Sequence, residues 1–358
     1  MKNYQHHLPI PELTEESSSS RVTLQSDDSL LLVRLSAIGD AVRLLPVAQY
    51  LRNNDFQGRI DCVVEPPINE FLELYPQFDA IHTVPLELSV TSFRTIFTAL
   101  STLRNRNYDW IFDMHGLLKS GLFSYLTGGQ RRIGYSSEKS RELNYYFQTA
   151  NLSNPLPPNM PRILKYLQLI RPVTPQFEFR RETISPEVPQ FDPSTRDLEA
   201  EARKKPLLIH PSSSHSRYGT SKEWGRDNFV ELIQNINPLI DVPVRITWGP
   251  GELGKAKSIA KEFKGETVEV AEEANSLQDL AYQLHHASLV VSVDTSVAHI
   301  ADLIGVPLVA VFGGSNHHIH APLLTNYRFV TRRKLEDSIE DIPVARVQTA
   351  IQDLLDEL

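Results

Sequence analysis

Four stretches of the chain place a carboxylate, hydroxyls or a lysine directly after a short apolar run. They are V-R-L-S-A-I-G-D with Asp40, H-P-S-S-S to S-K-E-W with Ser212, Ser213 and Lys222, W-G-P-G-E with Glu252, and V-D-T-S-V-A-H with Asp294, Thr295, Ser296 and His299. A helix that begins after a strand offers free N–H groups and the positive end of its dipole, which favour an anion. These residue types therefore suit a ligand that carries phosphates.

The stretch around Asp294 is the strongest of the four. A buried strand is expected to end at Asp294, and Thr295 and Ser296 open a helix whose hydroxyls add donors for an anion. On local chemistry alone an N-cap explains Asp294 equally well. His299 alone is better explained as a packed, hydrogen-bonded histidine.

The second and third stretches have ordinary explanations as well. Ser212 and Ser213 can solvate a diphosphate while Lys222 supplies a point charge, but serine-rich surface loops are common. Glu252 begins a helix after a glycine-rich turn, where a carboxylate can accept hydrogen bonds from ribose hydroxyls. The preference of helix N-termini for acidic residues explains Glu252 too.

Asp40 raises a different question, because an acid is out of place in a site that binds anions. It follows the expected strand at 30–35 and precedes a helix, whose N-terminus keeps the carboxylate ionised. An ionised carboxylate in a cleft can act as a base. The alternative is again an N-terminal cap.

The elements that must position these residues alternate along the chain. Strands are expected at 30–35, 60–65, 110–114, 206–209, 244–248, 289–293 and 308–312, and helices at 41–52, 92–105, 117–126, 224–235, 252–263, 277–285, 295–304 and 343–358. Such alternation predicts an α/β protein with parallel sheets covered on both faces. We expect two doubly wound, Rossmann-like domains facing a cleft, with ligands at the carboxyl ends of the strands.

Composition suggests where these domains begin and end. We expect a polar tail over 1–25, an N-terminal domain over 26–172, a proline- and charge-rich linker over 173–205, a C-terminal domain over 206–335 and a C-terminal helix over 336–358. A length of 358 residues suits two domains.

The bulk composition excludes several classes of protein. A net charge of −8 argues against a general nucleic-acid binder. Cys62 is the only cysteine, which excludes an intrachain disulfide and a cysteine-based zinc site. No apolar stretch reaches the roughly 18 residues of a membrane span, and the tail lacks the apolar region of a secretory signal.

In their order and spacing these stretches resemble the glycosyltransferase family that contains the ADP-heptose–lipopolysaccharide heptosyltransferases. The resemblance covers about residues 30 to 313 and is carried by V-R-L-S-A-I-G-D-A-V-R-L-L-P, F-D-M-H-G-L-L-K-S, R-I-G-Y with S-R-E-L, H-P-S-S-S with S-K-E-W, W-G-P-G-E, S-L-Q-D-L-A and V-D-T-S-V-A-H-I-A-D-L-I-G-V-P. The chain departs from the family at G-G-S-N-H-H-I-H, where a G-P-T-D-P-like turn is common, and at His115, where relatives often carry Gln.

The resemblance implies a two-domain, B-type glycosyltransferase fold and an inverting, metal-independent transfer. The donor would be ADP-L-glycero-D-manno-heptose, bound by a nucleotide-sugar-binding C-terminal domain over 206–335. The acceptor would be the inner core of lipopolysaccharide on lipid A, bound by an acceptor-binding N-terminal domain over 26–172. The implied roles are general base for Asp40, phosphate binding for Ser212, Ser213 and Lys222, ribose binding for Glu252, diphosphate and sugar binding for Asp294, Thr295, Ser296 and His299, and acceptor binding for Lys119 and Arg141.

Several alternatives stay open. One is a nucleotide-sugar epimerase or hydrolase on the same fold, and another is a transferase for a different donor or acceptor. A binding protein without chemistry is disfavoured by the joint presence of Asp40, Lys222, Glu252 and Asp294, and a dinucleotide dehydrogenase by the lack of G-x-G-x-x-G after the first strand. A metal at His317, His318 and His320 is less favoured than solvent-facing histidines, so no cofactor is expected. We expect a cytoplasmic protein, with a peripheral position on the inner face of the inner membrane left open.

Overall fold

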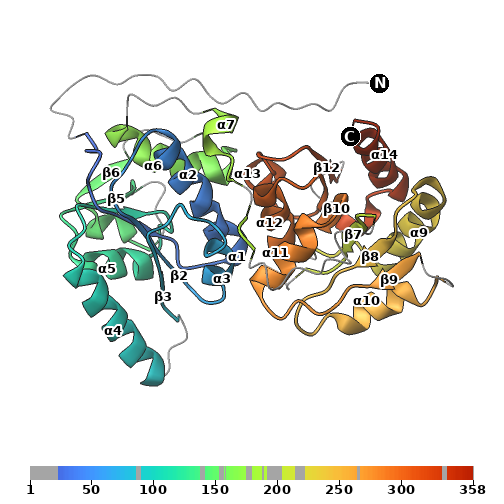
Figure 1. Ribbon diagram of the computed structural model, residues 1–358, viewed down its shortest axis with the longest axis horizontal. Helices are drawn as coiled ribbons and strands as arrows, with labels where there is room; N and C mark the ends of the chain where they lie inside the picture. The colour runs from blue at the N-terminus through green and yellow to red at the C-terminus, as the bar shows by residue number, and fades with distance from the viewer. Residues whose placement is uncertain are drawn as a thin grey trace. The chain divides into compact units, whose positions relative to one another are not determined.

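The chain forms two compact units, Met1–Pro186 (unit 1) and Glu187–Leu358 (unit 2), each with one six-stranded parallel sheet (Figure 1). This computed structural model describes residues 23–85, 90–137, 142–152, 157, 159–174, 180–187, 189–191, 204–213, 222–263, 267–332 and 337–357. The division falls within the segment expected as a linker, and the expected domain boundaries stay predictions.

The sheet of unit 1 has the strand order β3-β2-β1-β4-β5-β6. Its strands are β1 Leu30–Val33, β2 Ile60–Val64, β3 Ala80–Thr83, β4 Trp110–Asp113, β5 Arg131–Tyr135 and β6 Ala150–Leu152. Strand β1 is buried throughout and lies between β2 and β4, with Val33 opposite Val63 and Asp113. The segments that follow β1 and β4 therefore leave the sheet side by side.

The helices of unit 1 are α1 Ile38–Ala41, η1 Val42–Leu44, α2 Leu45–Asn53, α3 Ile68–Leu72, α4 Val90–Asn105, α5 Leu118–Thr127, η2 Asn144–Phe147, α6 Arg162–Ile170, η3 Arg171–Val173 and α7 Arg181–Ile184. They include the expected ones at 92–105 and 117–126, a divided form of the one expected at 41–52, and others, such as α3, α6 and α7, that were not expected. The single helix expected over 41–52 is three consecutive segments. Pro46 lies in the first turn of α2, where its missing N–H has no intrahelical partner to lose.

Unit 2 repeats this topology with the strand order β12-β11-β10-β7-β8-β9. Its strands are β7 Leu207–His210, β8 Val244–Ile246, β9 Val268–Val270, β10 Leu289–Val293, β11 Leu308–Phe312 and β12 Tyr327–Thr331. Taken in chain order within each unit, both sheets have the order 3-2-1-4-5-6 that is typical of the Rossmann fold. The expectation of two Rossmann-like, doubly wound α/β units is confirmed.

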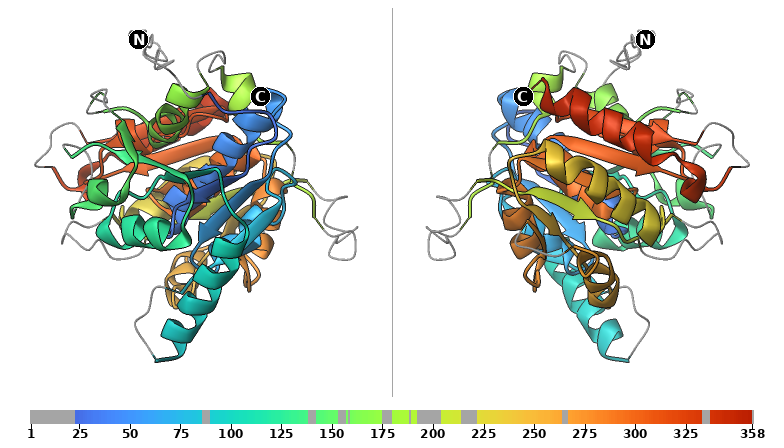
Figure 2. Two further views of the ribbon diagram at one scale, coloured as in Figure 1. Left: turned by 90° about the vertical axis from the view of Figure 1, so that its left-hand side faces the viewer. Right: turned by 90° about the vertical axis from the view of Figure 1, so that its right-hand side faces the viewer.

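The helices of unit 2 are α9 Arg226–Ile236, η5 Asn237–Leu239, α10 Leu253–Ala260, α11 Leu277–His285, α12 Ser296–Ile304, α13 His317–His320, η6 Ile339–Asp341 and α14 Val344–Leu355. The longer helices of unit 2 bury apolar residues, whereas the short η5 and α13 bury none. Figure 2 shows α9 and α14 side by side over the sheet, and both contribute to one core cluster. Within the described residues of both units, no helix combines the length and apolar character that crossing a membrane requires.

Candidate active site

Asp40 lies in the first turn of α1, just beyond the carboxyl end of β1, and three arginines contact its carboxylate. Arg34 donates from Nη2 to Oδ2, and Oδ1 lies 3.2 Å from Nη1 of Arg43 and 3.2 Å from Nε of Arg162. The N-cap of α1 is Ala37, so the cap alternative does not describe Asp40. The carboxylate keeps 18% of its side chain exposed, and three guanidinium groups favour its ionised form.

Arg34 also joins the turn after β1 to the loop after β4. Its Nη1 donates to the carbonyl oxygens of Met114 and His115, at 3.2 and 3.3 Å. Burial, followed by the charges of Arg34 and Lys119, lowers the pKa of His115 to about 2, so this imidazole is neutral. Its Nδ1 is buried without a hydrogen-bond partner among the described residues. Sequence reasoning did not place His115 in the site, and this orphaned nitrogen makes it a candidate for contact with a ligand.

Asp113 fixes the loop that carries His115 and the start of α5, which carries Lys119. Its fully buried carboxylate accepts hydrogen bonds from the backbone N–H groups of His115 and Gly116 and from the Ser120 hydroxyl, at 3.0, 3.1 and 2.9 Å. The side-chain amide of Asn144, in η2, donates to the same carboxylate at 2.6 Å. The loop conformation therefore depends on a segment about 30 residues further along the chain.

The two residues expected on the acceptor side have different outcomes. Lys119 is exposed in the first turn of α5, at the same edge of the sheet as Asp40. Arg141 lies outside the described residues. The role of both in acceptor binding stays a prediction.

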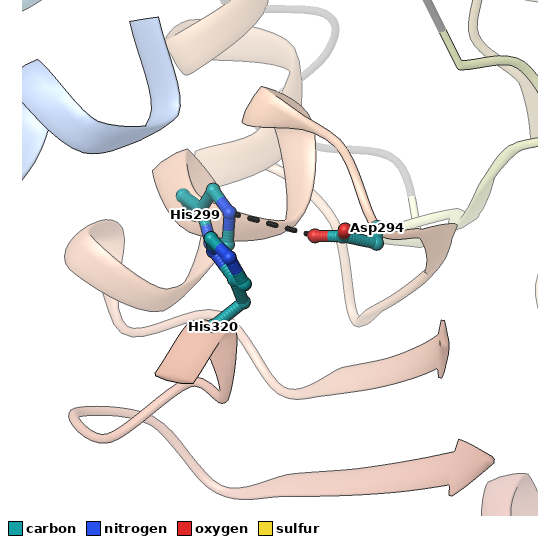
Figure 3. A group of neighbouring side chains, drawn as sticks. All are labelled: Asp294, His299 and His320. Atoms are coloured by element: carbon teal, nitrogen blue, oxygen red, sulfur yellow. Dashed lines mark ion pairs between the residues drawn. The ribbon is translucent and has the colours of Figure 1, made fainter. Parts of the chain in front are cut away.

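In unit 2, Asp294 directly follows β10, a central strand of the sheet, and is 3% exposed (Figure 3). Nζ of Lys222 lies 2.7 Å from its Oδ2, and the Ser315 hydroxyl donates to the same oxygen. Nε2 of His299 lies 3.8 Å from Oδ1. Burial opposes ionisation, but the positive charges of His299 and Lys222 outweigh it and hold the pKa of Asp294 well below its usual range.

Helix α12 begins directly after this carboxylate. Its N-cap is Thr295 rather than Asp294, and the Thr295 side chain makes no capping hydrogen bond. Thr295 and Ser296 are half-buried, and the Thr295 hydroxyl lies 3.2 Å from that of Ser292. The first N–H groups of α12 thus lack the side-chain cap that a helix start often has, which suits an anion.

The hydroxyl loop after β7 leaves the sheet beside Asp294. Ser292 in β10 is paired with His210 in β7, so Asp294 and Ser212 each follow two residues later at the same edge. The Ser212 hydroxyl is buried without a hydrogen-bond partner among the described residues, and Ser213 is buried as well. The structure brings Ser212, Ser213, Lys222 and Asp294 to one edge, although the loop between Ser213 and Lys222 lies outside the described residues.

Glu252 closes the turn that follows β8, the other neighbour of β7. Its Oε2 accepts a hydrogen bond from the backbone N–H of Gly249 at 2.8 Å, and the residue is the N-cap of α10. This hydrogen bond gives Glu252 a structural role at the start of a helix, which is one of the two explanations that the sequence offers. Binding of a ribose by Glu252 stays a prediction.

One group in unit 2 has the donor set of a metal site. Single ligand atoms of Asp294, His299 and His320 lie within 4.8 Å of one another (Figure 3). Two imidazoles and a carboxylate suit a divalent transition metal. The ammonium group of Lys222 already contacts Asp294, however, and balances its charge. Of the three histidines weighed from the sequence, only His320 belongs to this group.

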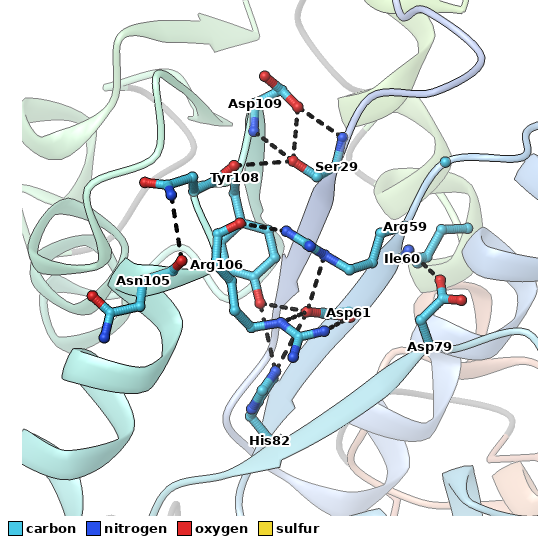
Figure 4. A network of polar contacts seen from close by, with 12 residues as sticks. Ser29, Arg59, Ile60, Asp61, Asp79, His82, Asn105, Arg106, Tyr108 and Asp109 are labelled. Atoms are coloured by element: carbon cyan, nitrogen blue, oxygen red, sulfur yellow. Dashed lines mark hydrogen bonds and ion pairs between the residues drawn. The ribbon is translucent and has the colours of Figure 1, made fainter.

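A further buried carboxylate, Asp61, lies at the amino-terminal end of β2 (Figure 4). It accepts a hydrogen bond from the Tyr108 hydroxyl at 2.5 Å, and its Oδ2 lies 2.7 Å from Nε of Arg106 and 3.5 Å from Nε2 of His82. Ligand sites in this kind of fold lie at the other ends of the strands. We therefore treat the Asp61 network as structural.

The sequence model of glycosyltransferase family 9 (heptosyltransferase) matches residues 96–341. The chain belongs to glycosyltransferase family 9. It is therefore a glycosyltransferase, as the motifs predicted, and the matched range covers the loop after β4 and all the expected donor-side residues.

Individual heptosyltransferases resemble most of the chain at low identity. The chain is 24% identical to the lipopolysaccharide core heptosyltransferase OpsX of Haemophilus influenzae, over 84% of this chain and 82% of OpsX. It is 24% identical to lipopolysaccharide heptosyltransferase 1 of Campylobacter coli, over 82% of this chain and 86% of that protein. The structure of the E. coli heptosyltransferase WaaC with ADP matches with a TM-score of 0.73 and 19% identity, over 91% of this chain and 99% of WaaC. This likeness confirms the expected B-type fold.

Proposed function

We propose that this family 9 enzyme transfers a heptose from ADP-L-glycero-D-manno-heptose to the inner core of lipopolysaccharide, with inversion at the anomeric carbon. The curated relatives are named as lipopolysaccharide heptosyltransferases, and the WaaC structure was solved with ADP. One observation carries the proposal for this chain. Lys222, the hydroxyl loop and the start of α12 meet at the carboxyl edge of the unit 2 sheet, where a diphosphate fits.

On the donor side, these groups stabilise the leaving ADP. Negative charge grows on the diphosphate as the glycosidic bond breaks, and donors that are already in position stabilise it without reorganisation. Lys222 supplies the point charge, and Thr295 and Ser296 lie beside the first N–H groups of α12. Asp294 holds Lys222 in place.

On the acceptor side, Asp40 takes the proton of the attacking hydroxyl. Three arginines around a carboxylate make it a weak base, since they favour its ionised form. The carboxylate or phosphate groups of an acceptor can pair with these guanidinium groups in place of Asp40. We propose that its binding draws arginines away from Asp40 and raises the basicity of the carboxylate when it is needed.

The reaction as proposed uses no metal ion. The ammonium of Lys222 and the helix N-terminus supply the positive charge that a metal would otherwise bring to the diphosphate. The cytoplasmic location expected from the sequence stays a prediction.

The test is turnover of ADP-heptose by the purified protein in EDTA, with and without Kdo-lipid A in detergent. ADP release that depends on the acceptor, with one heptose added to the acceptor mass, supports the proposal. Proton NMR of the product gives the anomeric configuration. Release without acceptor indicates a hydrolase, and conversion of the heptose without release indicates an epimerase. A strict need for added metal contradicts the proposed mechanism.

A further inference from the structure

Helix α5 is amphipathic in the reverse sense from a normal surface helix. Its buried residues are Ser120, Gly121, Phe123, Ser124 and Thr127, of which one is large and apolar. Its exposed face carries Leu118, Leu122, Tyr125 and Leu126, each between 39% and 54% exposed, together with Lys119. A surface helix normally turns its apolar stripe toward the core. Here that stripe faces solvent.

Hydrogen bonds and close backbone contact hold α5 in this orientation. The Ser120 hydroxyl donates to the buried Asp113 carboxylate at 2.9 Å. Gly121 packs so closely on η2 that an added Cβ would lie 2.6 Å from Nδ2 of Asn144. Rotating the helix to bury its leucines would break both contacts, so the exposed stripe is a fixed feature of unit 1.

The stripe continues onto the segment that packs against α5. Leu143 and Tyr146 are 59% and 71% exposed, and the ring of Phe147 lies 6.1 Å from that of Tyr125. We call Leu118, Leu122, Tyr125, Leu126, Leu143 and Tyr146 the α5 face. Figure 2 shows α5 on the outside of unit 1, next to α4.

Most charges near the α5 face are positive, and Glu142, next to Leu143, is an exception. Residues 114–137 include Lys119, Arg131 and Arg132 and contain no Asp or Glu. Residues 90–108 also lack Asp and Glu and include Arg94 and Arg104, while Arg106 in that range is paired with Asp61. The guanidinium of Arg132 lies over the Tyr125 ring at 5.3 Å. The whole chain has a net charge of −8, so this basic and apolar region contrasts with the rest of the protein.

We propose that the α5 face docks on the surface of a bilayer that contains anionic lipids. Leucines inserted at the level of the acyl chains, tyrosines at the head groups and basic side chains facing lipid phosphates are the features of an interfacial helix. The choice of a bilayer over a protein partner rests on the proposed function, because lipid A anchors that acceptor in a membrane. With 10 residues, α5 is too short to span a bilayer.

The experiment is co-sedimentation of the full chain with vesicles of phosphatidylethanolamine and phosphatidylglycerol, and with vesicles of phosphatidylcholine alone. We expect binding to the anionic vesicles that weakens as salt rises, because salt screens the attraction to lipid phosphates. The double variant Leu122→Glu with Leu126→Glu should bind about tenfold or more weakly, since it removes apolar contacts and adds negative charge. Both sites are exposed, and glutamate favours a helix, so the variant should fold.

The matched control is Leu239→Glu, at an exposed leucine of unit 2. It should bind anionic vesicles as the unsubstituted protein does. Equal binding by the double variant, or equal binding to both kinds of vesicle, overturns the proposal. So does a change of sedimentation coefficient in the double variant without vesicles, which would assign the α5 face to self-association.

Transfer to acceptor dispersed in detergent separates this proposal from the proposed function. The double variant should keep that activity within about twofold while losing activity on acceptor embedded in vesicles. If the unsubstituted protein binds vesicles but transfers no heptose, the function fails and the docking surface stands.

Discussion

Asp40 and Asp294 each follow a central strand of a sheet, β1 in unit 1 and β10 in unit 2, yet their surroundings differ. Asp40 keeps 18% of its side chain exposed and contacts three arginines, whereas Asp294 is 3% exposed and contacts a lysine, a serine and a histidine. A carboxylate at the surface can change partners when a ligand arrives. A buried carboxylate is fixed by its partners and fixes them in return. The carboxyl edges of two sheets of the same strand order thus place one carboxylate where it can exchange partners and another where its partners are fixed.

The largest effect is expected on turnover, when the carboxylate of Asp40 is replaced. Asp40→Asn should lower turnover by about 10²–10⁴-fold, the usual contribution of a general base, and leave ADP affinity within a few-fold. Steady-state kinetics and calorimetric titration with ADP check the two halves of this prediction. Asp55→Asn, at an exposed aspartate of unit 1, is the matched control and should keep full turnover. Turnover that survives in the Asp40 variant excludes it as the base.

On the donor side, we expect a substitution to weaken the binding of ADP. Lys222→Ala should weaken ADP binding by roughly 10–100-fold, since a hydrogen bond to a charged group contributes about 1.5–3 kcal/mol. The variant also leaves the Asp294 carboxylate without its ammonium partner, so its melting temperature should fall. Lys261→Ala, at an exposed lysine after α10, should change neither quantity. An unchanged ADP affinity in the Lys222 variant would remove the lysine from the donor site.

A smaller effect is expected at the acceptor side. Lys119→Gln should raise the KM for an anionic acceptor by about 3–10-fold, because an exposed ammonium contributes modestly to binding an anion. ADP affinity should stay the same. The measurement is initial rate against acceptor concentration at saturating donor. A selective rise in the donor KM would instead place Lys119 on the other side of the reaction.

The smallest expected effect is on how stability depends on pH, through a histidine of unit 2. Burial lowers the pKa of His210 from 6.5 to about 4, although its hydrogen bond to Thr247 opposes the shift. The unfolded chain therefore binds a proton at His210 between these values that the folded chain does not, and stability should fall as pH drops from about 6.5 to about 4. Urea unfolding of unsubstituted protein and of His210→Gln at pH 7 and pH 4.5 checks this. The variant should lose less stability on acidification, and equal losses would contradict the assignment.

Sequence patterns predicted the fold well because buried parallel strands and amphipathic helices have clear periodicities. They missed the edge strands β3, β6, β9 and β12 and also β5, which lies next to an edge. Of these, β3 and most of β12 are only half-buried, which weakens the apolar pattern. The motifs placed Asp40 and Asp294 at the edges where the structure has them. The contacts that Asp40 and Asp294 make with other side chains were not predicted. Arg34 and Arg43 were visible beside Asp40, but nothing in the sequence links it to Arg162, far along the chain. The same holds for the grouping of Asp294 with His320.

The single carboxylate of Asp113 has a consequence for protein engineering. It binds the loop after β4, the start of α5 and the η2 segment, with Gln148 as a further donor at 3.3 Å. A designer who wishes to graft another acceptor preference onto this scaffold should move residues 113–148 as one block. Exchanging only the loop around His115 and Lys119 would separate the carboxylate from donors chosen to match it, and the transplanted loop would lose its shape.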